Sequence, residues 1–412
     1  MQIRYRFRLY PSPAQERALA KAFGCCRVVF NDVIALREAA LAEGRPWPGD
    51  AEVSRTVVTE AKRRPDRAWL AGTSAVALQQ AVRDANRAYR NHFASRTGAR
   101  AGGPVGKPRF KSRRDRRQTM RFTRNARFAV TAARRLRLPG IGEVAVVWSR
   151  DLPSEPSSVT VIRDASGRYF ASFVCEAPAR PAAEGGAIGI DLGLASFVAD
   201  SDGRKTPAPR ILRRADRRLA RAQRRFARRR PGSRNRERAR REVATLHARV
   251  ADARTDFLHR LSSKIISENQ VVVVEDLDVA ALARTRFAKS VRDAGWARFT
   301  AMLEYKAALA GGRLVRVPRF LPSTRTCSSC WTVGEHRPLR VRYWACNDCG
   351  VLHDRDVNAA KVILAAGLAE RENACGAVED LLARLRAQAS AESQARYPAG
   401  DWEEAGITAA AR

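Results

Sequence analysis

The sequence predicts a multidomain α+β protein, and three features of its 412 residues support this. Some stretches alternate strictly between apolar and polar residues, as strands do, whereas others carry an apolar residue at every third or fourth position, as helices do. Two C-x2-C pairs indicate a small metal-binding module. The length is sufficient for two or more domains that each have a core of their own.

The first predicted element is a strand over residues 1–12, and a mainly helical segment over 13–98 follows it. Apolar and basic side chains alternate in "IRYRFRL", which is typical of a half-buried strand. Ser12 precedes Pro13 and stands three residues before Gln15, the pattern of a capping box at a helix start. The arginine-rich stretch "ALQQAVRDANRAYRNHFASR" is either a solvated helix face or, as the charge of the chain favours, a nucleic-acid contact.

Strand patterns dominate the third segment, residues 99–182. It begins with a connector rich in Gly, Pro and basic residues, which we expect to contact phosphate through Lys107, Arg109 and Lys111. The run "SSVTVIRDASGRYFASFVCE" has two alternating stretches around a turn and predicts a hairpin. Together with the first strand of the chain, these strands are expected to close a small β-barrel. The linker "APARPAAEGG" places a domain boundary near residue 183.

A carboxylate interrupts the apolar stretch "AIGIDLGLASFVAD" of residues 187–200. The two-residue period of a strand puts Asp191 on the same face as Gly189 and Gly193, while the isoleucines point to the opposite, core face. An isolated carboxylate is costly to bury, so it is usually paired, hydrogen-bonded or bound to a metal. Asp191 is therefore either a structural residue at a strand end or a metal ligand.

An arginine-rich helical hairpin is predicted over residues 208–266, within a larger segment that spans 183–325. Apolar residues recur at spacings of three and four on both sides of a Pro-Gly-Ser turn, which gives a narrow apolar seam and a basic exterior. The whole chain has 77 Lys and Arg against 42 Asp and Glu, a formal net charge of +35. This density of one sign favours a polyanionic partner over a solvated surface. We expect phosphate contacts from four arginines of the hairpin: Arg213, Arg217, Arg224 and Arg228.

Two further acidic residues stand at the ends of predicted elements. Glu275 ends the buried strand "QVVVVE", and the side chain of the next residue, Asp276, points to the opposite face. Asp356 lies at the start of a helix whose apolar residues follow it at three, four and seven positions, and Asp354 is expected to cap that helix. Together with Asp191, these provide the carboxylate oxygens with which a protein holds two Mg²⁺ ions for phosphodiester cleavage.

A zinc ribbon is predicted over residues 326–350, before the helical segment 351–367. Its ligands follow the pattern C-x2-C-x15-C-x2-C, in which each pair forms a knuckle around one tetrahedral ion: Cys327, Cys330, Cys346 and Cys349. Four cysteines leave no vacancy for His336, so the predicted Zn²⁺ is structural. The remaining cysteines are expected to be core or incidental residues: Cys25, Cys26, Cys175 and Cys375.

The composition also indicates where in the cell the protein is expected and which partners it is expected to have. No apolar run approaches the length of a membrane span and no signal peptide precedes the first strand, so we expect a cytoplasmic, nucleoid-associated protein without a membrane partner. The tail over 368–412 is richer in acidic residues and poor in large apolar ones. We expect it to be largely disordered apart from a short helix around 377–386.

These motifs, in this order, resemble the TnpB family of transposon-encoded RNA-guided nucleases, which are regarded as ancestors of type V CRISPR effectors. The resemblance extends over almost the whole chain to about residue 366. It runs through "YRFRLYPSPAQ", "GKPRFKSR", "IGIDLGL", "DFLHRLSSKI", "VVVVEDLDV", "GWARFTAMLEYKA", "STRTCSSC" and "CNDCGVLHDRDVNAAKVIL".

The resemblance implies an RNase H-like, RuvC-type nuclease domain in which Asp191, Glu275 and Asp356 bind two catalytic Mg²⁺ ions. It implies that the zinc ribbon is inserted before the last of these acids. It further implies that the N-terminal barrel is interrupted by a helical lobe, and that this half binds a guide RNA and a short motif beside a double-stranded DNA target. A companion transposase encoded nearby is a further expected partner.

Two positions depart from the family pattern. Trp331 stands where a glycine is usual after the first cysteine pair, and Val362 stands where asparagine is common after "NAA". All three acids remain, which argues against the relatives that have lost cleavage. The expected function is therefore RNA-guided, Mg²⁺-dependent DNA cleavage. Two alternatives are an unguided transposase or nuclease that acts on transposon ends, and a guided DNA-binding repressor that does not cut.

Overall fold

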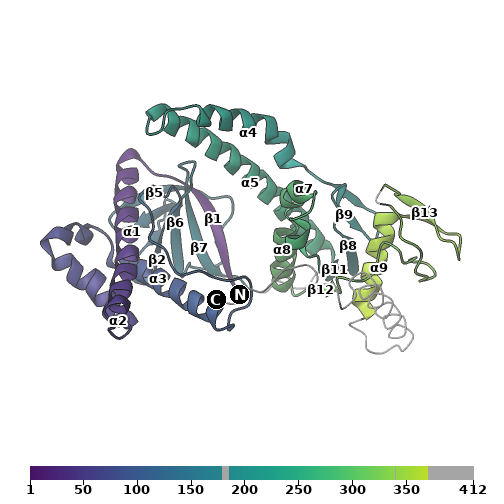
Figure 1. Ribbon diagram of the computed structural model, residues 1–412, viewed down its shortest axis with the longest axis horizontal. Coiled ribbons are helices and arrows are strands. Elements are labelled where there is room, and N and C mark those ends of the chain that lie inside the picture. The colour runs from purple at the N-terminus through teal and green to yellow at the C-terminus, as the bar shows by residue number, and fades with distance from the viewer. Residues whose placement is uncertain (179–184, 339, 370–412) are drawn as a thin grey trace, which may run out of the picture. The chain divides into compact units, whose positions relative to one another are not determined.

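The computed structural model describes residues 1–178, 185–338 and 340–369 (Figure 1). Contacts within the chain separate two compact units, Met1–Pro178 with Arg228–Thr245, and Ala179–Ala227 with Leu246–Arg412. The predicted helix around 377–386, most of the predicted tail and Cys375 lie outside the described residues. No helix in the described part of the chain is both long and apolar enough to cross a bilayer.

The first unit contains a seven-stranded antiparallel sheet in the order β2-β6-β7-β1-β5-β4-β3. Because the strand at the chain start pairs with β7 on one side and β5 on the other, it lies in the middle of the sheet. The strands are β1 (Gln2–Tyr10), β2 (Gln118–Thr123), β3 (Ala129–Val130), β4 (Arg135–Leu138), β5 (Gly142–Val147), β6 (Ser158–Arg163) and β7 (Tyr169–Glu176).

Two predictions for this sheet have different outcomes. The β6–β7 hairpin is confirmed, and its turn is held by Asp164, whose Oδ1 accepts hydrogen bonds from the backbone N–H groups of Ser166 and Arg168. The expected closed barrel is not formed: β2 and β3 are the two ends of the sheet, and no pairing between them is present among the described residues. β3 has only two residues, which leaves little ladder with which to close a ring.

Helices of the first unit cover this sheet and confirm the predicted helical segment. The capping box is present, because Ser12 Oγ accepts from the backbone N–H of Gln15 at 3.3 Å and Gln15 Oε1 accepts from the backbone N–H of Ser12 at 2.9 Å. Cys25, Cys26 and Cys175 are buried in one apolar core with the sheet, as predicted. The helices are α1 (Pro13–Ala42), α2 (Asp50–Ser54) and α3 (Ala75–Arg96), with a π-helical turn at Arg55–Glu60 and 3-10 turns at Ala61–Arg63 and Pro65–Gly72.

The second unit contains a five-stranded mixed sheet in the order β10-β9-β8-β11-β12. Its central strand β8 is antiparallel to β9 and parallel to β11, and β12 continues the parallel part. The strands are β8 (Ala187–Asp191), β9 (Ser196–Asp200), β10 (Lys205–Pro207), β11 (Val271–Glu275) and β12 (Arg313–Val317).

Helices cover both faces of this sheet. On one face, Ile188 and Ile190 pack with Phe299 of α8 and Leu258 of α5, as the period-2 pattern predicts. On the other face, Val271 and Val273 pack against α9. The helices of the unit are α4 (Ile211–Ala227), α5 (Arg234–Glu268), α6 (Val279–Leu282), α7 (Ala288–Ala294), α8 (Trp296–Leu309) and α9 (Arg355–Ala369).

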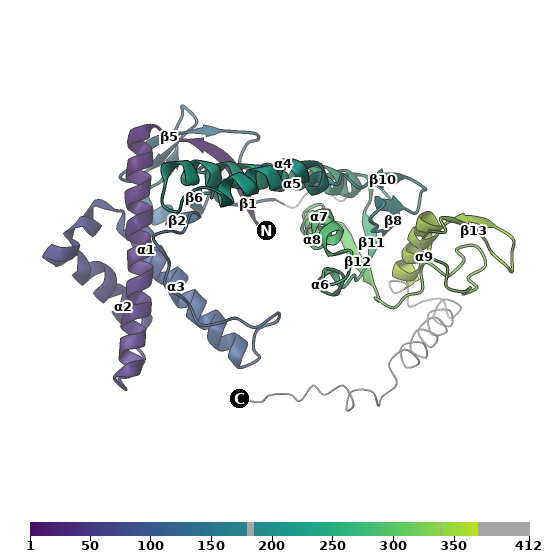
Figure 2. The same cartoon turned by 45° about the horizontal axis from the view of Figure 1, so that its top comes forward.

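The predicted helical hairpin is confirmed as α4 and α5, which run side by side in both views (Figures 1 and 2). Its seam is apolar, with Leu219 and Ala222 of α4 and Leu246 and Val250 of α5 buried. The tip, Arg228–Thr245, belongs to the first compact unit. One helix thus contributes to both units.

Candidate active site and metal centre

Two of the candidate acids end neighbouring strands. β8 and β11 are parallel, with Ile190 opposite Val274, so the next residues along the two strands, Asp191 and Glu275, lie beside each other at the carboxyl edge of the sheet. Glu275 accepts a short hydrogen bond from the hydroxyl of buried Ser323. The side chain of Asp276 turns away and pairs with an arginine outside this site, as strand geometry predicts.

The third candidate acid, Asp356, reaches the same edge because α9 packs directly on β8. A Cβ atom on Gly189 would lie 2.1 Å from the carbonyl oxygen of Ala360, so only glycine allows this approach. Asp354 Oδ1 accepts hydrogen bonds at 3.1 Å from the backbone N–H groups of Asp356 and Val357, which confirms the predicted helix cap. The glycine face of β8 therefore points at the helix that carries Asp356.

Burial makes the ionised forms of Asp191 and Glu275 unfavourable. Burial, helped by the charges of Glu275 and Asp356, raises the pKa of Asp191 to about 8, although Arg355 and Lys205 act in the opposite direction. Burial also raises the pKa of Glu275, against the effect of its hydrogen bond from Ser323. Two recessed carboxylates whose ionised forms are disfavoured in this way are typical of a site that binds a cation.

Two basic side chains contact Asp356 from other elements. Lys205 Nζ, from β10, lies 3.3 Å from Asp356 Oδ2 and 2.7 Å from Asp354 Oδ1. Arg342, from the predicted ribbon, donates to Asp356 Oδ1 at 3.0 Å. Sequence reasoning missed both residues, because Lys205 lies 151 residues before Asp356 and Arg342 lies between the two cysteine pairs without being one of the predicted ligands.

The four predicted zinc ligands form a compact group. The Sγ atoms of Cys327, Cys330, Cys346 and Cys349 all lie within 4.8 Å of one another, so together they could hold one metal ion. Among the described residues no other set of three or more such ligands is as tight, and the carboxylates of the acidic site are less closely drawn together.

The surroundings of the cysteine group include a residue that the spacing did not reveal. His353 is buried, and its Nε2 lies 3.0 Å from Cys327 Sγ, whereas His336 is not part of the group. A ring N–H at this position can hydrogen-bond to the thiolate.

The structure shows the local environment of the two residues that depart from the family pattern. Trp331 adopts a left-handed φ of 65°, which suits glycine better, and Val362 is buried in the core.

The basic residues expected to contact phosphate fall into two classes. The side chains of Arg213, Arg217, Arg224 and Arg228 are exposed along the hairpin, as are those of Lys107 and Arg109 in the connector. Lys111 differs, because burial lowers its pKa and its Nζ lies 3.7 Å from the centre of the Phe30 ring.

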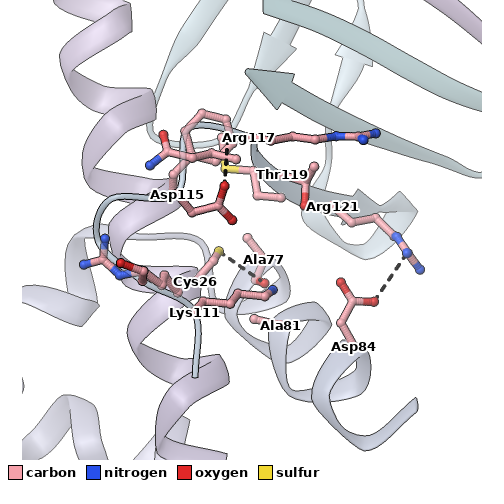
Figure 3. A pocket seen from close by; sticks show the side chains of 14 residues that line it. Cys26, Ala77, Ala81, Asp84, Lys111, Asp115, Arg117, Thr119 and Arg121 are labelled. Carbon is pink, nitrogen blue, oxygen red and sulfur yellow. Dashed lines mark hydrogen bonds and ion pairs between the residues drawn. The ribbon is translucent and has the colours of Figure 1, made fainter. Parts of the chain in front are cut away.

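Lys111 lines a cavity of about 340 Å³ in the first unit, together with Cys26, Asp84 and Asp115 (Figure 3). The connector is held there by Asn31, which exchanges two hydrogen bonds with the backbone of Lys111 at 2.8 and 3.0 Å. The connector is therefore anchored at this point, and Lys111 faces a recess instead of the open surface.

Comparison with known proteins places this architecture in a family. Residues 172–286 match a family described as "Probable transposase", residues 296–363 match "Cas12f1-like, TNB domain", and residues 1–46 match "Helix-turn-helix domain". In this structure the last of these segments forms strand β1 and the single helix α1.

Curated relatives match over nearly the full length. A Streptomyces pristinaespiralis protein named "Putative RNA-guided DNA endonuclease" is 42% identical, over 90% of each chain. The Escherichia coli K12 protein InsQ, which carries the same description, is 28% identical over 90% of this chain and 93% of its own. A solved complex of Cas12f1 with single guide RNA and target DNA has the same fold, with a TM-score of 0.53 at 13% identity over 85% of this chain and 82% of that one.

A mixed α/β chain with an acidic group at a sheet edge and a four-cysteine cluster is thus related to guided nucleases in both sequence and fold. The chain belongs to the TnpB family, as its motifs predicted.

Proposed function

We propose that this protein is an RNA-guided DNA endonuclease that cleaves DNA by metal-dependent hydrolysis at Asp191, Glu275 and Asp356. The observation that carries the proposal is the position of these acids on β8, β11 and α9, at one edge of one sheet. Its support from comparison is the shared description of the full-length relatives. Base pairing with a guide would supply sequence recognition, and the protein would supply shape recognition and cutting.

The strand order supports assignment of the second unit to the RNase H-like, RuvC-type class. Three antiparallel strands, β10, β9 and β8, are extended on the other side of β8 by two parallel strands, β11 and β12. In such a sheet the central strand and its parallel neighbour end at the same edge. Acids at these two strand ends and on a helix crossing them can therefore meet one scissile phosphate.

The donor set fits Mg²⁺. Carboxylate oxygens are the ligands that this hard cation prefers, and the raised pKa of Asp191 and Glu275 means that a cation would favour their ionised forms. When bound, two Mg²⁺ ions supply an activated water and stabilise the leaving oxygen. The chain itself orients the ligands, since Ser323 holds Glu275 and the Asp354 cap fixes the first turn of α9.

The four-cysteine group is proposed to bind one structural Zn²⁺. Four thiolates complete a tetrahedron and leave no open position for substrate, so the ion would stabilise the fold and take no part in cutting. The exposed arginines of the α4–α5 hairpin are proposed to contact phosphates of the guide RNA or of the double-stranded DNA target.

One experiment tests this function against its alternatives. The chain is expressed with its native flanking DNA, the RNA that copurifies is sequenced, and the complex is offered a duplex library that contains a sequence complementary to the RNA. We expect one RNA species and cutting confined to matching duplexes. Cutting without bound RNA would favour an unguided transposase or nuclease, and guided binding without cutting in the presence of Mg²⁺ would favour a repressor.

A further inference from the structure

Asp356 differs from the other two acids of the proposed site because its two oxygens are both occupied by cations from the chain itself. Oδ1 accepts from Arg342 at 3.0 Å, and Oδ2 lies 3.3 Å from the ammonium of Lys205. Among the described residues, neither Asp191 nor Glu275 forms an ion pair with a basic side chain. A metal ion that uses Asp356 must therefore compete with tethered cations at this end of the site.

Lys205 is held close to the site by a second carboxylate. Its Nζ lies 2.7 Å from Asp354 Oδ1, and this oxygen also accepts the two backbone N–H groups that begin α9. The hydrogen bonds to the start of α9 fix the position of the Asp354 carboxylate. Asp354 can therefore keep its ion pair with Lys205 even when Asp356 binds a metal ion. Lys205 can thus leave Asp356 without leaving the site.

We propose that Lys205 is a positioning residue that neutralises Asp356 in the metal-free protein and yields it to Mg²⁺, thereby weakening metal binding until the ion concentration is sufficient. The inference rests on the proposed function of the acidic group. Its physical basis is that a positive charge beside a divalent ion repels it, while the same charge relieves repulsion among Asp191, Glu275 and Asp356 when no ion is bound.

The test measures Mn²⁺ binding to the full-length, zinc-loaded chain freed of nucleic acid, by the electron paramagnetic resonance signal of the unbound ion. Lys205→Met should bind Mn²⁺ on the order of tenfold more tightly than the wild type, because the competing charge is lost. Its unfolding midpoint without Mn²⁺ should fall, and the midpoint should rise more on adding Mn²⁺ than it does for the wild type. A residue with a merely structural role would lower the midpoint without tightening metal binding.

The matched control is Lys289→Met. Lys289 is exposed and pairs with Asp216 at 2.7 Å, and in the described part of the chain it forms no ion pair with any of the three acids, so its loss should leave Mn²⁺ affinity unchanged. Asp191→Asn tests the site itself and should abolish tight binding. If Asp191→Asn leaves Mn²⁺ binding intact, the proposed metal site is overturned. If Asp191→Asn abolishes binding and Lys205→Met leaves it unchanged or weaker, the role of Lys205 alone is overturned.

Discussion

Asn358 Oδ1 accepts a hydrogen bond at 2.8 Å from the backbone N–H of Ser328, and so joins the first cysteine knuckle to the helix that carries Asp356. The amide nitrogen of Asn358 completes the link by donating to the carbonyl of Thr326 at 2.7 Å. Asn358 is almost fully buried, so both bonds are shielded from water. The order of the knuckle and the position of the acidic site are therefore physically connected.

The first prediction follows from this link. The wild-type chain should contain about one zinc ion, and Cys327→Ser should lower both the zinc content and the unfolding midpoint, because metal binding by such a module contributes to folding. Metal analysis and thermal unfolding measure the two effects. The control is Cys175→Ser, a buried cysteine of the first unit, which should leave zinc content unchanged. Fully active wild-type protein without zinc would contradict the assignment.

A second prediction concerns the close approach of α9 to β8. Gly189→Ala should lower stability and impair cutting, since the added Cβ would lie 2.1 Å from the carbonyl oxygen of Ala360 and 2.7 Å from Leu364 Cβ. The helix must shift, and Asp356 must shift with it. Gly186→Ala is the control, because a Cβ there meets nothing within 4 Å. Equal unfolding midpoints and cutting rates for the two variants would contradict the packing described here.

The backbone patterns of the site could be predicted from sequence, whereas its charge partners could not. Alternation around Asp191 and the three- and four-residue spacing after Asp356 depend only on neighbours along the chain, and both determine which face is buried. The contacts of Lys205 and Arg342 with Asp356 span 151 and 14 residues, so they depend on how elements pack. The tight cysteine group was predictable, because its spacing alone defines two knuckles.

Failures of prediction in the first unit have a similar origin. The alternating strands were identified, but whether the sheet closes depends on its edge strands, and the very short β3 leaves an open order. Lys111 looked like its basic neighbours in sequence, yet the Asn31 contacts turn it toward Phe30 and a cavity. Neither the open sheet nor the inward position of Lys111 can be recognised from the sequence around these residues.

The third prediction tests the hairpin. Replacing Arg213, Arg217, Arg224 and Arg228 with alanine should weaken nucleic-acid binding and make its salt dependence shallower, by a slope of roughly 0.9 per lost phosphate contact on duplex DNA. Helix formation should survive, because alanine is a good helix former. Lysine at the same four positions keeps the charge and serves as the control. An unchanged slope in the alanine variant would make the hairpin a solvated surface.

A fourth prediction uses the raised pKa of Asp191, about 8 in the folded protein against an ordinary value of 3.8. Between these values the folded state binds the proton that the unfolded state has lost, so this group makes stability fall as pH rises from about 4 to 8. Asp191→Asn removes that contribution. Without Mg²⁺, the unfolding midpoint of the variant minus that of the wild type should increase steadily from pH 5 to pH 8. Parallel midpoint curves for the two proteins would show that Asp191 is not perturbed in this way.

The most direct test of the central claim compares Asp191→Asn with the wild type as guide-loaded complexes, and measures cutting of a matched duplex in Mg²⁺. We expect the variant to bind this duplex as tightly as the wild type and to cut it more slowly by several powers of ten, because the proposed phosphate contacts and the base pairing with the guide do not involve Asp191, whereas a ligand of the proposed catalytic site is lost. Cutting at the wild-type rate by Asp191→Asn would contradict the assignment of these acids as the catalytic site.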